Sequence, residues 1–505
     1  MDEEGEDEET QNNARSRPGW LLLLTMCAAG IGGTFQYGYN LTIINAPTTH
    51  IQKFVNETWL ERYGSTLDSW IITLIWSIIV SVLPLGGFMG ALLAGPMAIR
   101  LGRKKSLLFN NLFIILSAIL CGFSRYAKSF EMIILGRILT GINSGVSMCI
   151  QPMYLVESSP KNLRGTGALS CAISTTIGLI MGQVVGLREI LGSEEVWPLL
   201  LASNVVPGIL QLMTLPWVPE SPRYLLIDLK DKDSCEAALR RFRGSCDFSS
   251  EVEEMMVEQR AIQGQTPKSL CELIRDPSLR RQLLAIVVLS SAMQLCGNDS
   301  MYFYATYVFQ AAGIPSEKIQ YVVIGTGSCE FITSVACTLV IDRLGRRVLV
   351  MGGYSLMSVW AVVFMVALSQ QEHITWMPYL SMVCIFAYIL SFGIGPAGVT
   401  GLMPAEIFDQ MARPAAYMIC GSLMWLMLFL VGLAFPFIMQ GLGHFCFVPF
   451  LVVCVSTTLY IGFFLPETKG KSVLEITEEF KTLKSKPRRE ENGWLGPQEI
   501  KSTSL

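Results

Sequence analysis

The stretch WIITLIWSIIVSVLPL, residues 70–85, decides the fold class, because none of its side chains carries a charge. A helix that spans a bilayer needs about 20 mainly apolar residues, and similar apolar blocks recur at 20–24, 285–295 and 447–465. In the whole 505-residue chain, 51% of the residues are hydrophobic and 16% are charged, whereas soluble domains carry about 25% charged residues. The sequence therefore predicts an all-α membrane protein that crosses the bilayer many times.

Twelve transmembrane helices are predicted when the chain is divided at its charged and proline-rich breaks. Six precede a polar middle segment and six follow it, near 20–44, 69–97, 105–123, 132–157, 165–188, 197–217, 282–312, 319–341, 348–369, 377–407, 413–440 and 445–465. The predicted organisation is an N-terminal tail, a six-helix half, a linker, a second six-helix half and a C-terminal tail, at 1–19, 20–217, 218–281, 282–465 and 466–505.

The polar segments also carry local patterns. The start of the chain is acidic at 2–9, so the first helix is predicted to be retained and not cleaved as a signal peptide. In the linker, residues 234–243 and 251–260 are amphipathic and too polar to cross a bilayer, which predicts short helices on the cytoplasmic face. The tail after Lys471 is predicted to be partly disordered.

Basic residues give the predicted orientation of the bundle. They gather in alternate short loops, as Arg100, Arg103, Lys104, Lys105, Lys161, Arg164, Arg343, Arg346, Arg347 and Arg413. Short loops rich in Lys and Arg face the cytoplasm, so both termini and the linker are predicted to be cytoplasmic. The sequon Asn56-Glu57-Thr58 then falls in the first external loop, which makes Asn56 a candidate glycosylation site.

Three short motifs recur in the same order in both predicted halves. They are L-G-R-K at 101–104 and L-G-R-R at 344–347, a Glu seven residues before an Arg at 157/164 and 406/413, and P-E-S at 219–221 and P-E-T at 466–468. The members of each pair are about 245 residues apart, which is the period of a duplicated half. Two parallel halves with a substrate site between them describe major facilitator transporters, which rock one half against the other.

The charged residues of these motifs are candidates for a cytoplasmic gate. They lie at predicted helix ends, where charge-assisted hydrogen bonds can form when the two halves close. The alternative is that they mark loop ends and only orient the helices, since exposed ion pairs contribute little. The candidate gate residues are Arg103, Glu157, Arg164, Glu220, Arg223, Arg346, Arg347, Glu406, Arg413 and Glu467.

Other classes of function find little support in the composition. A formal net charge of −3 without a basic stripe argues against a nucleic-acid partner. The fourteen cysteines lie mostly singly in apolar segments and are expected to be free thiols, and no metal-binding spacing is present. The three histidines, His50, His373 and His444, are isolated, so neither an enzyme nor a cofactor is predicted.

Several motifs resemble those of the facilitative hexose transporters of solute carrier family 2. They are Tyr37-Gly38-Tyr39-Asn40, Gly136-Arg137, P-E-S-P-R at 219–223, Gln294-Leu295 and P-E-T-K-G at 466–470. The stretches MQLCGND at 293–299 and SFGIGPAGVT at 391–400 are similar to the fructose-associated class of that family. The resemblance covers nearly the whole chain. It implies the major facilitator fold and uniport of fructose, glucose or both across the plasma membrane, by a protein that works as a monomer without a cofactor.

The resemblance also implies a hexose-binding cavity lined by Tyr37, Met293, Gln294, Asn298, Asp299, Glu330, Gly401, Met424 and Trp425. Some positions depart from the family pattern. Gly401 stands where many members have a tryptophan, Ala172 where they have a glutamine, and Met424 where they have a polar residue. Asp299 and Glu330 stand where asparagines are common, and ionisable residues at membrane depth are costly and usually functional.

Three roles for Asp299 and Glu330 remain open from the sequence. They can accept hydrogen bonds from substrate hydroxyls, share a proton as a coupling site, or be neutralised inside the protein, for example by Thr326 or Ser328 beside Glu330. The competing functions are therefore a proton-coupled symporter or carrier of another polyol-like or anionic solute, and a non-transporting nutrient receptor that signals through its linker and tail.

Aromatic and glycine residues near these positions suggest mechanical roles. Tyr302, Phe303, Tyr304 and Trp425 are candidates for stacking on a sugar ring or for closing an outer gate, against the alternative of ordinary packing. Glycines between 393 and 401, together with Pro396, are predicted to interrupt one helix and to make it bendable, against the alternative of close helix packing.

Overall fold

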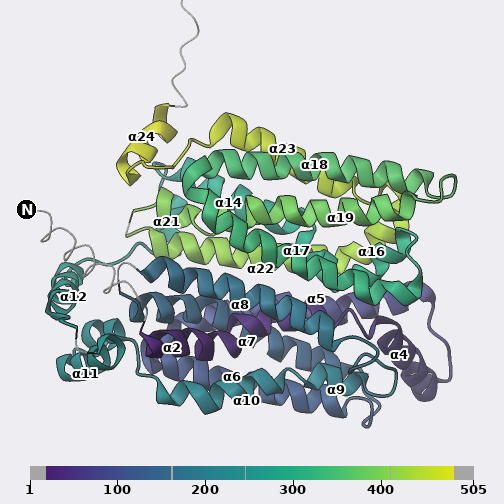
Figure 1. The fold of residues 1–505 in the computed structure, drawn as a ribbon, viewed down its shortest axis with the longest axis horizontal. Helices are drawn as coiled ribbons and strands as arrows, with labels where there is room; N and C mark the ends of the chain where they lie inside the picture. The colour runs from purple at the N-terminus through teal and green to yellow at the C-terminus, as the bar shows by residue number, and fades with distance from the viewer. Residues whose placement is uncertain (1–18, 161–162, 245, 410, 483–505) are drawn as a thin grey trace, which may run out of the picture.

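In the computed structural model the chain forms a bundle of long helices in two halves (Figure 1). The structure describes residues 19–160, 163–244, 246–409 and 411–482, so the acidic start and residues 483–505 lie outside it. Within the described ranges, ten helical spans are long and apolar enough to cross a membrane. Two shorter apolar helices, Leu169–Val185 and Val448–Phe464, occupy the predicted fifth and twelfth spans. The predicted all-α membrane fold is confirmed.

The first six spans form the first half, in the purple to teal part of Figure 1. Its helices are α2 (Trp20–Ile31) with α3 (Thr34–Ile43), α5 (Ser69–Leu101), α6 (Arg103–Phe123), α7 (Glu131–Ser158), α8 (Arg164–Val185), and α9 (Trp197–Ala202) with α10 (Val205–Thr214) and the turn η2 (Leu215–Trp217). The 33 residues of α5, at about 1.5 Å per residue, exceed a hydrocarbon core of about 30 Å.

The second half, in green to yellow, repeats this arrangement. Its helices are α14 (Arg280–Leu295) with α15 (Asn298–Phe303) and α16 (Ala305–Ala311), α17 (Ser316–Leu344), α18 (Arg346–Gln370), α19 (Met377–Ile394) with α20 (Pro396–Thr400) and α21 (Met403–Ile407), α22 (Arg413–Leu442) with the turn η4 (Gly443–Phe445), and α23 (Val448–Phe464). The two halves meet where α5 packs against α22 and α8 against α17.

Some spans are interrupted by a break between consecutive helices. Gly297 separates α14 from α15 with a φ of +81°, a left-handed conformation that favours glycine. The tenth span breaks at Gly395 and again after Thr400, as the glycine-rich sequence predicts. Broken helices of this kind commonly form binding sites in transporters.

Extramembrane helices distinguish the two ends of the bundle. One end, here called the linker end, carries η3 (Tyr224–Asp228), α11 (Lys232–Arg243), α12 (Ser249–Ile262), α13 (Leu270–Arg275) and α24 (Val473–Thr482). Helices α11 and α12 confirm the two amphipathic segments predicted in the linker, and α24 lies in the tail. The opposite end, the α4 end, carries α4 (Thr48–Tyr63), which the sequence did not predict.

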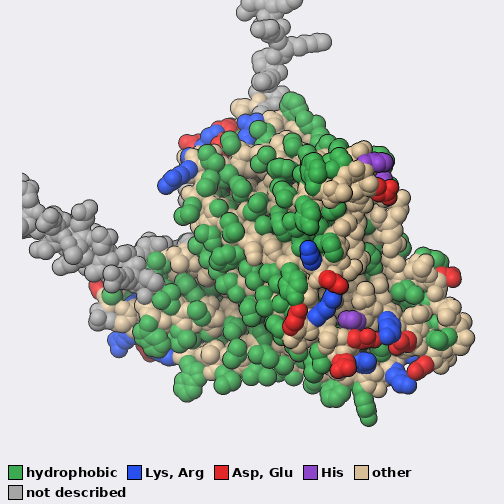
Figure 2. All heavy atoms as spheres, turned by 45° about the vertical axis from the view of Figure 1, so that its right-hand side comes forward, with side chains coloured by type: hydrophobic (Ala, Val, Ile, Leu, Met, Phe, Trp, Pro, Cys, Tyr) green, Lys and Arg blue, Asp and Glu red, His purple; other side chains and the backbone are tan. Residues whose placement is uncertain are grey.

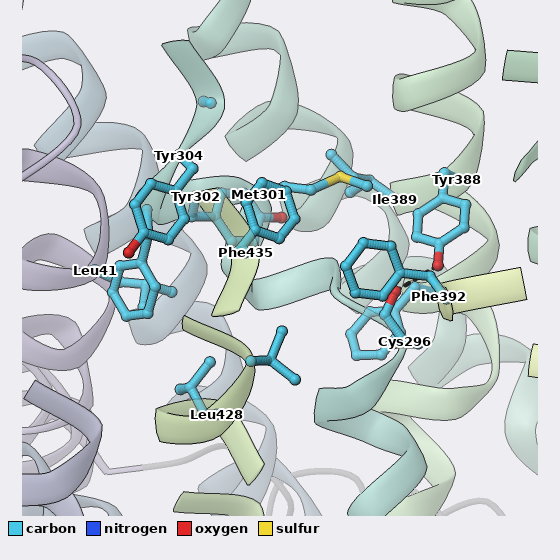
Figure 3. Close-up of a cluster of buried hydrophobic side chains, with 14 of the residues drawn as sticks. Leu41, Cys296, Met301, Tyr302, Tyr304, Tyr388, Ile389, Phe392, Leu428 and Phe435 are labelled. Atoms are coloured by element: carbon cyan, nitrogen blue, oxygen red, sulfur yellow. Dashed lines mark hydrogen bonds between the residues drawn. The ribbon is translucent and has the colours of Figure 1, made fainter. Parts of the chain in front are cut away.

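The surface is apolar along the flank of the bundle, whereas charged side chains gather at the ends (Figure 2). Large side chains such as Leu339 and Phe463 are 69% and 71% exposed, which suits contact with lipid. Inside, buried aromatic side chains such as Tyr302, Tyr304 and Phe435 lie close together (Figure 3). Tyr304 stacks on Phe435 with ring centroids 5.4 Å apart, and its hydroxyl donates to the carbonyl of Gly432 at 2.7 Å.

The cysteines conform to the expectation from the sequence. All fourteen are free thiols in the structure, and eight of them are buried, including Cys171, Cys337 and Cys384. They act as small apolar side chains between helices.

Candidate functional site

A group of polar side chains, here called the central cluster, lies between the two halves and is built around Asp299 at the start of α15. The carboxylate accepts hydrogen bonds from Gln294 Nε2 at 3.0 Å, Asn298 Nδ2 at 3.3 Å and the hydroxyl of Tyr37 at 3.4 Å. Gln294 lies in the last turn of α14 and Asn298 opens α15 after the turn at Gly297, whereas Tyr37 belongs to α3 of the first half. The contact between Tyr37 and Asp299 therefore joins the two halves.

Glu330 of α17 belongs to the same cluster through Tyr302. The hydroxyl of Tyr302 donates to Glu330 Oε2 at 2.6 Å. The sequence suggested Thr326 or Ser328 as neutralising neighbours, but Thr326 accepts from Gln183 and Ser328 donates to the carbonyl of Ile324. The partner of Glu330 is thus an aromatic hydroxyl from another helix and not a neighbour on its own helix.

Unused hydrogen-bonding capacity in this cluster marks it as a place for a ligand. Gln294 Oε1 and Asn298 Oδ1 are buried and have no protein partner, although buried polar atoms are normally satisfied. These oxygens lie on the side chains that hold Asp299, so acceptors are concentrated there. Hydroxyl groups of a bound molecule would satisfy them.

Trp425 of α22 forms an aromatic wall beside the cluster. Its ring meets that of Tyr37 edge to face, with centroids 5.5 Å apart and an interplanar angle of 82°. The indole is 2% exposed and fits against Gly87 of α5, where an added Cβ would lie 2.4 Å from the ring. A glycine is therefore required at position 87 for this ring to reach the centre.

Three more residues were predicted to line the cavity, namely Met293, Met424 and Gly401. Met293 and Met424 are half-buried and adjoin Gln294 and Trp425 in sequence. Gly401 is exposed at the end of α20, and a Cβ added there would meet open space. The small residue thus leaves room where a larger side chain would stand.

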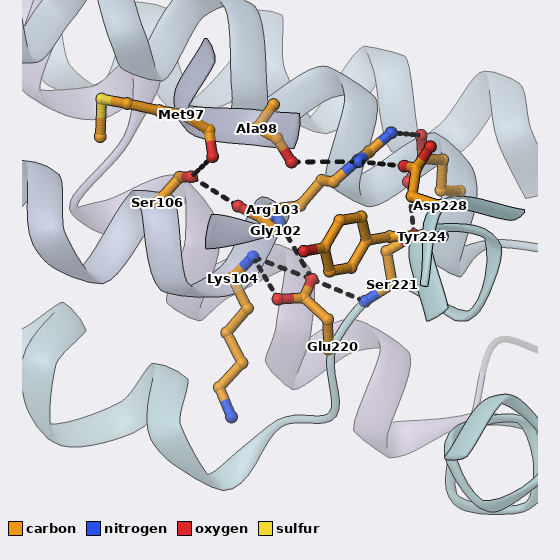
Figure 4. A network of polar contacts seen from close by, with 11 residues as sticks. Met97, Ala98, Gly102, Arg103, Lys104, Ser106, Glu220, Ser221, Tyr224 and Asp228 are labelled. Carbon is orange, nitrogen blue, oxygen red and sulfur yellow. Dashed lines mark hydrogen bonds and ion pairs between the residues drawn. The ribbon is translucent and has the colours of Figure 1, made fainter. Parts of the chain in front are cut away.

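A second group of residues, here called the first linker-end cluster, surrounds Arg103 at the start of α6 (Figure 4). The guanidinium pairs with Glu157 at 3.0 Å and with Asp228 at 2.8 Å, and lies over the ring of Tyr224 at 5.0 Å. Glu220 accepts from the backbone N–H groups of Arg103 and Lys104 at 3.2 and 3.0 Å. Glu157 also accepts from the hydroxyl of Ser221.

The second linker-end cluster repeats this pattern around Arg346 at the start of α18. Arg346 pairs with Glu406 at 2.9 Å, and Glu467 accepts from the backbone N–H groups of Arg346 and Arg347 at 2.9 and 3.1 Å. The hydroxyl of Thr468 donates to Glu406 at 2.6 Å. The three repeated motifs therefore come together in each half, and these pairs join residues of the same half.

Other candidate gate residues have different surroundings. Arg223 pairs with Glu258 of α12 at 3.0 Å, and Arg413 donates to the carbonyl of Phe408 at 3.4 Å. The side chain of Arg164 lies outside the described residues. Neither Asp228 nor Glu258 was predicted as a partner. Burial, together with the carboxylates of Glu220 and Asp228, raises the pKa of the Tyr224 hydroxyl.

Hydrogen bonds that join the two halves also occur toward the α4 end, and the sequence reasoning missed them. Gln183 Nε2 donates to the Thr326 hydroxyl at 2.9 Å, the Thr306 N–H to Asn45 Oδ1 at 2.9 Å, and the Arg188 N–H to Gln320 Oε1 at 3.0 Å. A polar amide within an apolar span, as at Gln183, is a signal that could have indicated such a contact.

Known proteins share this architecture and sequence. Residues 25–480 match the sugar (and other) transporter family. The human solute carrier family 2, facilitated glucose transporter member 11, is 61% identical over 487 residues, which cover 96% of this chain and 98% of the relative. The chain belongs to the sugar transporter family. The sheep facilitated glucose transporter member 5 is 44% identical over 460 residues, covering 91% of this chain and 92% of that relative.

Solved structures support the fold of this transporter. A partially occluded inward open structure of the xylose transporter XylE from E. coli has a TM-score of 0.74 at 20% identity, covering 90% of this chain and all of that one. The transporter is thus a multi-pass membrane protein of the major facilitator fold that moves sugars and is not an enzyme.

Proposed function

We propose that this transporter is a facilitative uniporter of hexoses, fructose and/or glucose, that works by alternating access in the plasma membrane. The observation that carries the proposal is the central cluster, in which Tyr37 of one half contacts Asp299 of the other beside the unpartnered oxygens of Gln294 and Asn298. A hexose presents hydroxyls around an otherwise apolar ring, so such acceptors beside the aromatic face of Trp425 suit it.

In this proposal each central residue has a defined part. Asp299 and Glu330 accept hydrogen bonds from sugar hydroxyls, Gln294 and Asn298 supply the free amide oxygens, and Trp425 packs on the ring. Met293, Met424 and Gly401 shape the remaining wall. Because Tyr37 and Asp299 lie on opposite halves, a sugar between them would respond when one half rocks against the other.

The orientation and the gate belong to the same proposal. The linker end carries the cationic loops, so we place it and both termini in the cytoplasm. The two linker-end clusters would hold helix ends together within each half, while the halves separate and meet as units. We also propose that the protein works as a monomer without a cofactor, since each chain contains both halves of the site.

Uptake of radiolabelled fructose and glucose into proteoliposomes tests this function. Wild type, Asp299→Asn and Glu330→Gln should be compared over a range of pH, with Glu317→Gln as the matched control, because Glu317 is exposed in the first turn of α17. The expected result is saturable uptake that follows the substrate gradient and does not change with pH. Reconstituted protein that moves neither sugar would contradict the proposal.

A second candidate, proton-coupled symport, is favoured by one observation. The hydrogen-bond partners described for Asp299 and Glu330 are neutral, namely Tyr37, Gln294 and Asn298 for the first and Tyr302 for the second. Carboxyls without a cation can exchange a proton during a transport cycle. Sugar accumulation driven by a pH gradient, and lost in Asp299→Asn or Glu330→Gln but kept in Glu317→Gln, would establish this alternative.

We further propose that Asn56 carries an N-linked glycan. Asn56 lies on α4 at the end opposite the linker, and its side chain is half-buried, while Thr58 of the sequon is 4% exposed. Treatment with an N-glycosidase should increase the electrophoretic mobility of protein expressed in animal cells, and Asn56→Gln should show the faster mobility without treatment. An unchanged mobility in both would contradict this assignment.

A further inference from the structure

A cavity of about 520 Å³ lies at the α4 end, between the two halves. Its walls come from the first half and α4 on one side and from α16 and α17 on the other. Acidic, basic and histidine side chains gather on this end of the surface (Figure 2). Amide and hydroxyl side chains contribute much of the lining, among them Asn45, Thr49, Gln183, Gln310, Ser316 and Gln320.

This cavity is distinct from the central cluster. Thr326 accepts the hydrogen bond from Gln183 at 2.9 Å, and this bond joins the two halves. Thr326 is four residues before Glu330 on α17, which places it one helical turn away, about 6 Å along the axis. Gln183 lines the cavity, so the contact between Gln183 and Thr326 lies between the cavity and the central carboxyls.

The lining includes a buried acceptor with no partner. Gln183 is 6% exposed and uses its amide N–H on Thr326, but its Oε1 is buried without a hydrogen bond. A buried carbonyl oxygen of this kind normally has a donor. This oxygen lies against Gly327 of α17, where an added Cβ would be 2.4 Å from it, so recognition of a ligand in the cavity depends on the other amides and hydroxyls of the lining.

The charges of the lining favour a neutral ligand. Arg188 and Glu194, which both line the cavity, have opposite signs. Arg188 donates to the carbonyl of Ser316 at 3.1 Å, and Glu194 pairs with Lys53 at 2.6 Å. With these groups already engaged, amides and hydroxyls determine the recognition, and they match the hydroxyls of a saccharide.

We infer that this cavity is a second saccharide-binding site whose occupant holds the transporter with its α4 end closed. Both halves form its walls, and the bonds from Gln183 to Thr326 and from Arg188 to Gln320 require that the halves meet there. A ligand that binds one conformation better than the other shifts the population toward it. The effect of the occupant on the conformation rests on the proposed alternating access, whereas the binding of a saccharide to the cavity does not.

Sucrose is a suitable probe, and saturation-transfer NMR on the purified full chain detects its binding without transport. Gln310→Trp and Thr49→Trp should fill the cavity, because both residues line it and are exposed. Gln370→Trp is the matched control, since Gln370 is an exposed glutamine at the end of α18 outside the cavity. Wild type and Gln370→Trp should transfer saturation to sucrose, and the two cavity variants should not.

Hexose uptake with sucrose at the α4 side provides the second test, with each variant compared to its own uptake without sucrose. In wild type and Gln370→Trp, sucrose at its Kd should reduce the maximal rate about twofold without changing KM, and this effect should disappear in Gln310→Trp. An increase in KM alone would indicate competition at the central cluster and would overturn the inference. Sucrose binding that persists in both cavity variants, or that is absent from wild type, would also overturn it. Uptake without sucrose tests the proposed function separately.

Discussion

In the first half of the transporter Arg103 pairs with Glu157 and Asp228, whereas in the second half Arg346 pairs with Glu406. Both arginines start a helix after a glycine, and in both halves a glutamate caps that helix start. The side chains of Arg103 and Glu157 are each 12% exposed, against 15% and 23% for Arg346 and Glu406. In the first half the linker contributes Asp228 and Tyr224 as partners of Arg103. Both halves thus contain an arginine–glutamate ion pair, and the linker covers the pair of the first half, Arg103 with Glu157.

The largest difference should appear when the two arginines are removed. Arg103→Leu leaves two carboxylates without their cation and should destabilise the protein by about 3–5 kcal/mol, the usual cost of an uncompensated buried charge. Arg346→Leu should cost less, about 1–3 kcal/mol, because Glu406 is more exposed. Thermal unfolding of the two purified variants measures the difference. Equal losses would show that the linker adds nothing to the first cluster.

The two glycines before these arginines should respond alike. Gly102 and Gly345 have φ values of +85° and +87°, and an added Cβ would lie 2.7 Å from Glu220 Oε2 and 2.8 Å from Glu467 Oε2. Gly102→Ala and Gly345→Ala should each cost about 1–3 kcal/mol through backbone strain and displacement of the carboxylate. Thermal unfolding measures both.

Gly421→Ala is the control for these substitutions, since Gly421 lies in the helix α22 with open space around a Cβ. That change should be neutral or slightly stabilising, because alanine favours a helix more than glycine does. If Gly102→Ala or Gly345→Ala were as mild as Gly421→Ala, the glycines would not be needed for the glutamate caps.

The sequence predicted the fold well because its signals are local and repeated. Each span is a continuous apolar stretch, and the twelve expected ranges correspond to helices of the structure. The short helices α4, α13 and α24 were missed, since their mixed polar sequences carry no apolar period long enough to stand out. Helix α4, for example, includes His50, Lys53 and Glu57 among its apolar residues.

The candidate sites were predictable where a motif repeats and not where distant helices meet. The pairs around Arg103 and Arg346 follow from duplicated motifs, whereas Asp228 is one acidic residue in a polar linker and carries no such signal. Likewise, Tyr302 and Glu330 are 28 residues apart on different helices, so their contact depends on how α15 packs against α17. Contacts of this kind require the tertiary structure.

The cation–π contact of the first cluster should have a smaller effect than its ion pairs. Tyr224→Leu removes the ring that faces Arg103 and should destabilise the protein by about 1–2 kcal/mol, whereas Tyr224→Phe keeps the ring and should be nearly neutral. Thermal unfolding should also show that the effect of Tyr224→Leu shrinks in an Arg103→Leu background, because coupled residues are not additive. Full additivity would mean that Tyr224 stabilises the cluster by packing alone.

The smallest effect should come from Arg223, which stands two residues after the P-E-S motif, whereas Lys469 directly follows the P-E-T motif. Arg223 pairs with Glu258 of α12, and their side chains are 30% and 26% exposed, so a double-mutant cycle of Arg223→Ala and Glu258→Ala should give a coupling of about 0.2–1 kcal/mol. Lys469→Ala with Glu258→Ala is the control and should show no coupling, because Lys469 donates to the carbonyl of Arg343.

The pair of Arg223 and Glu258 connects the linker to the first half. A large loss of hexose uptake in Arg223→Ala that Glu258→Ala does not reproduce would instead assign Arg223 to the gate, as its place in the motif predicts.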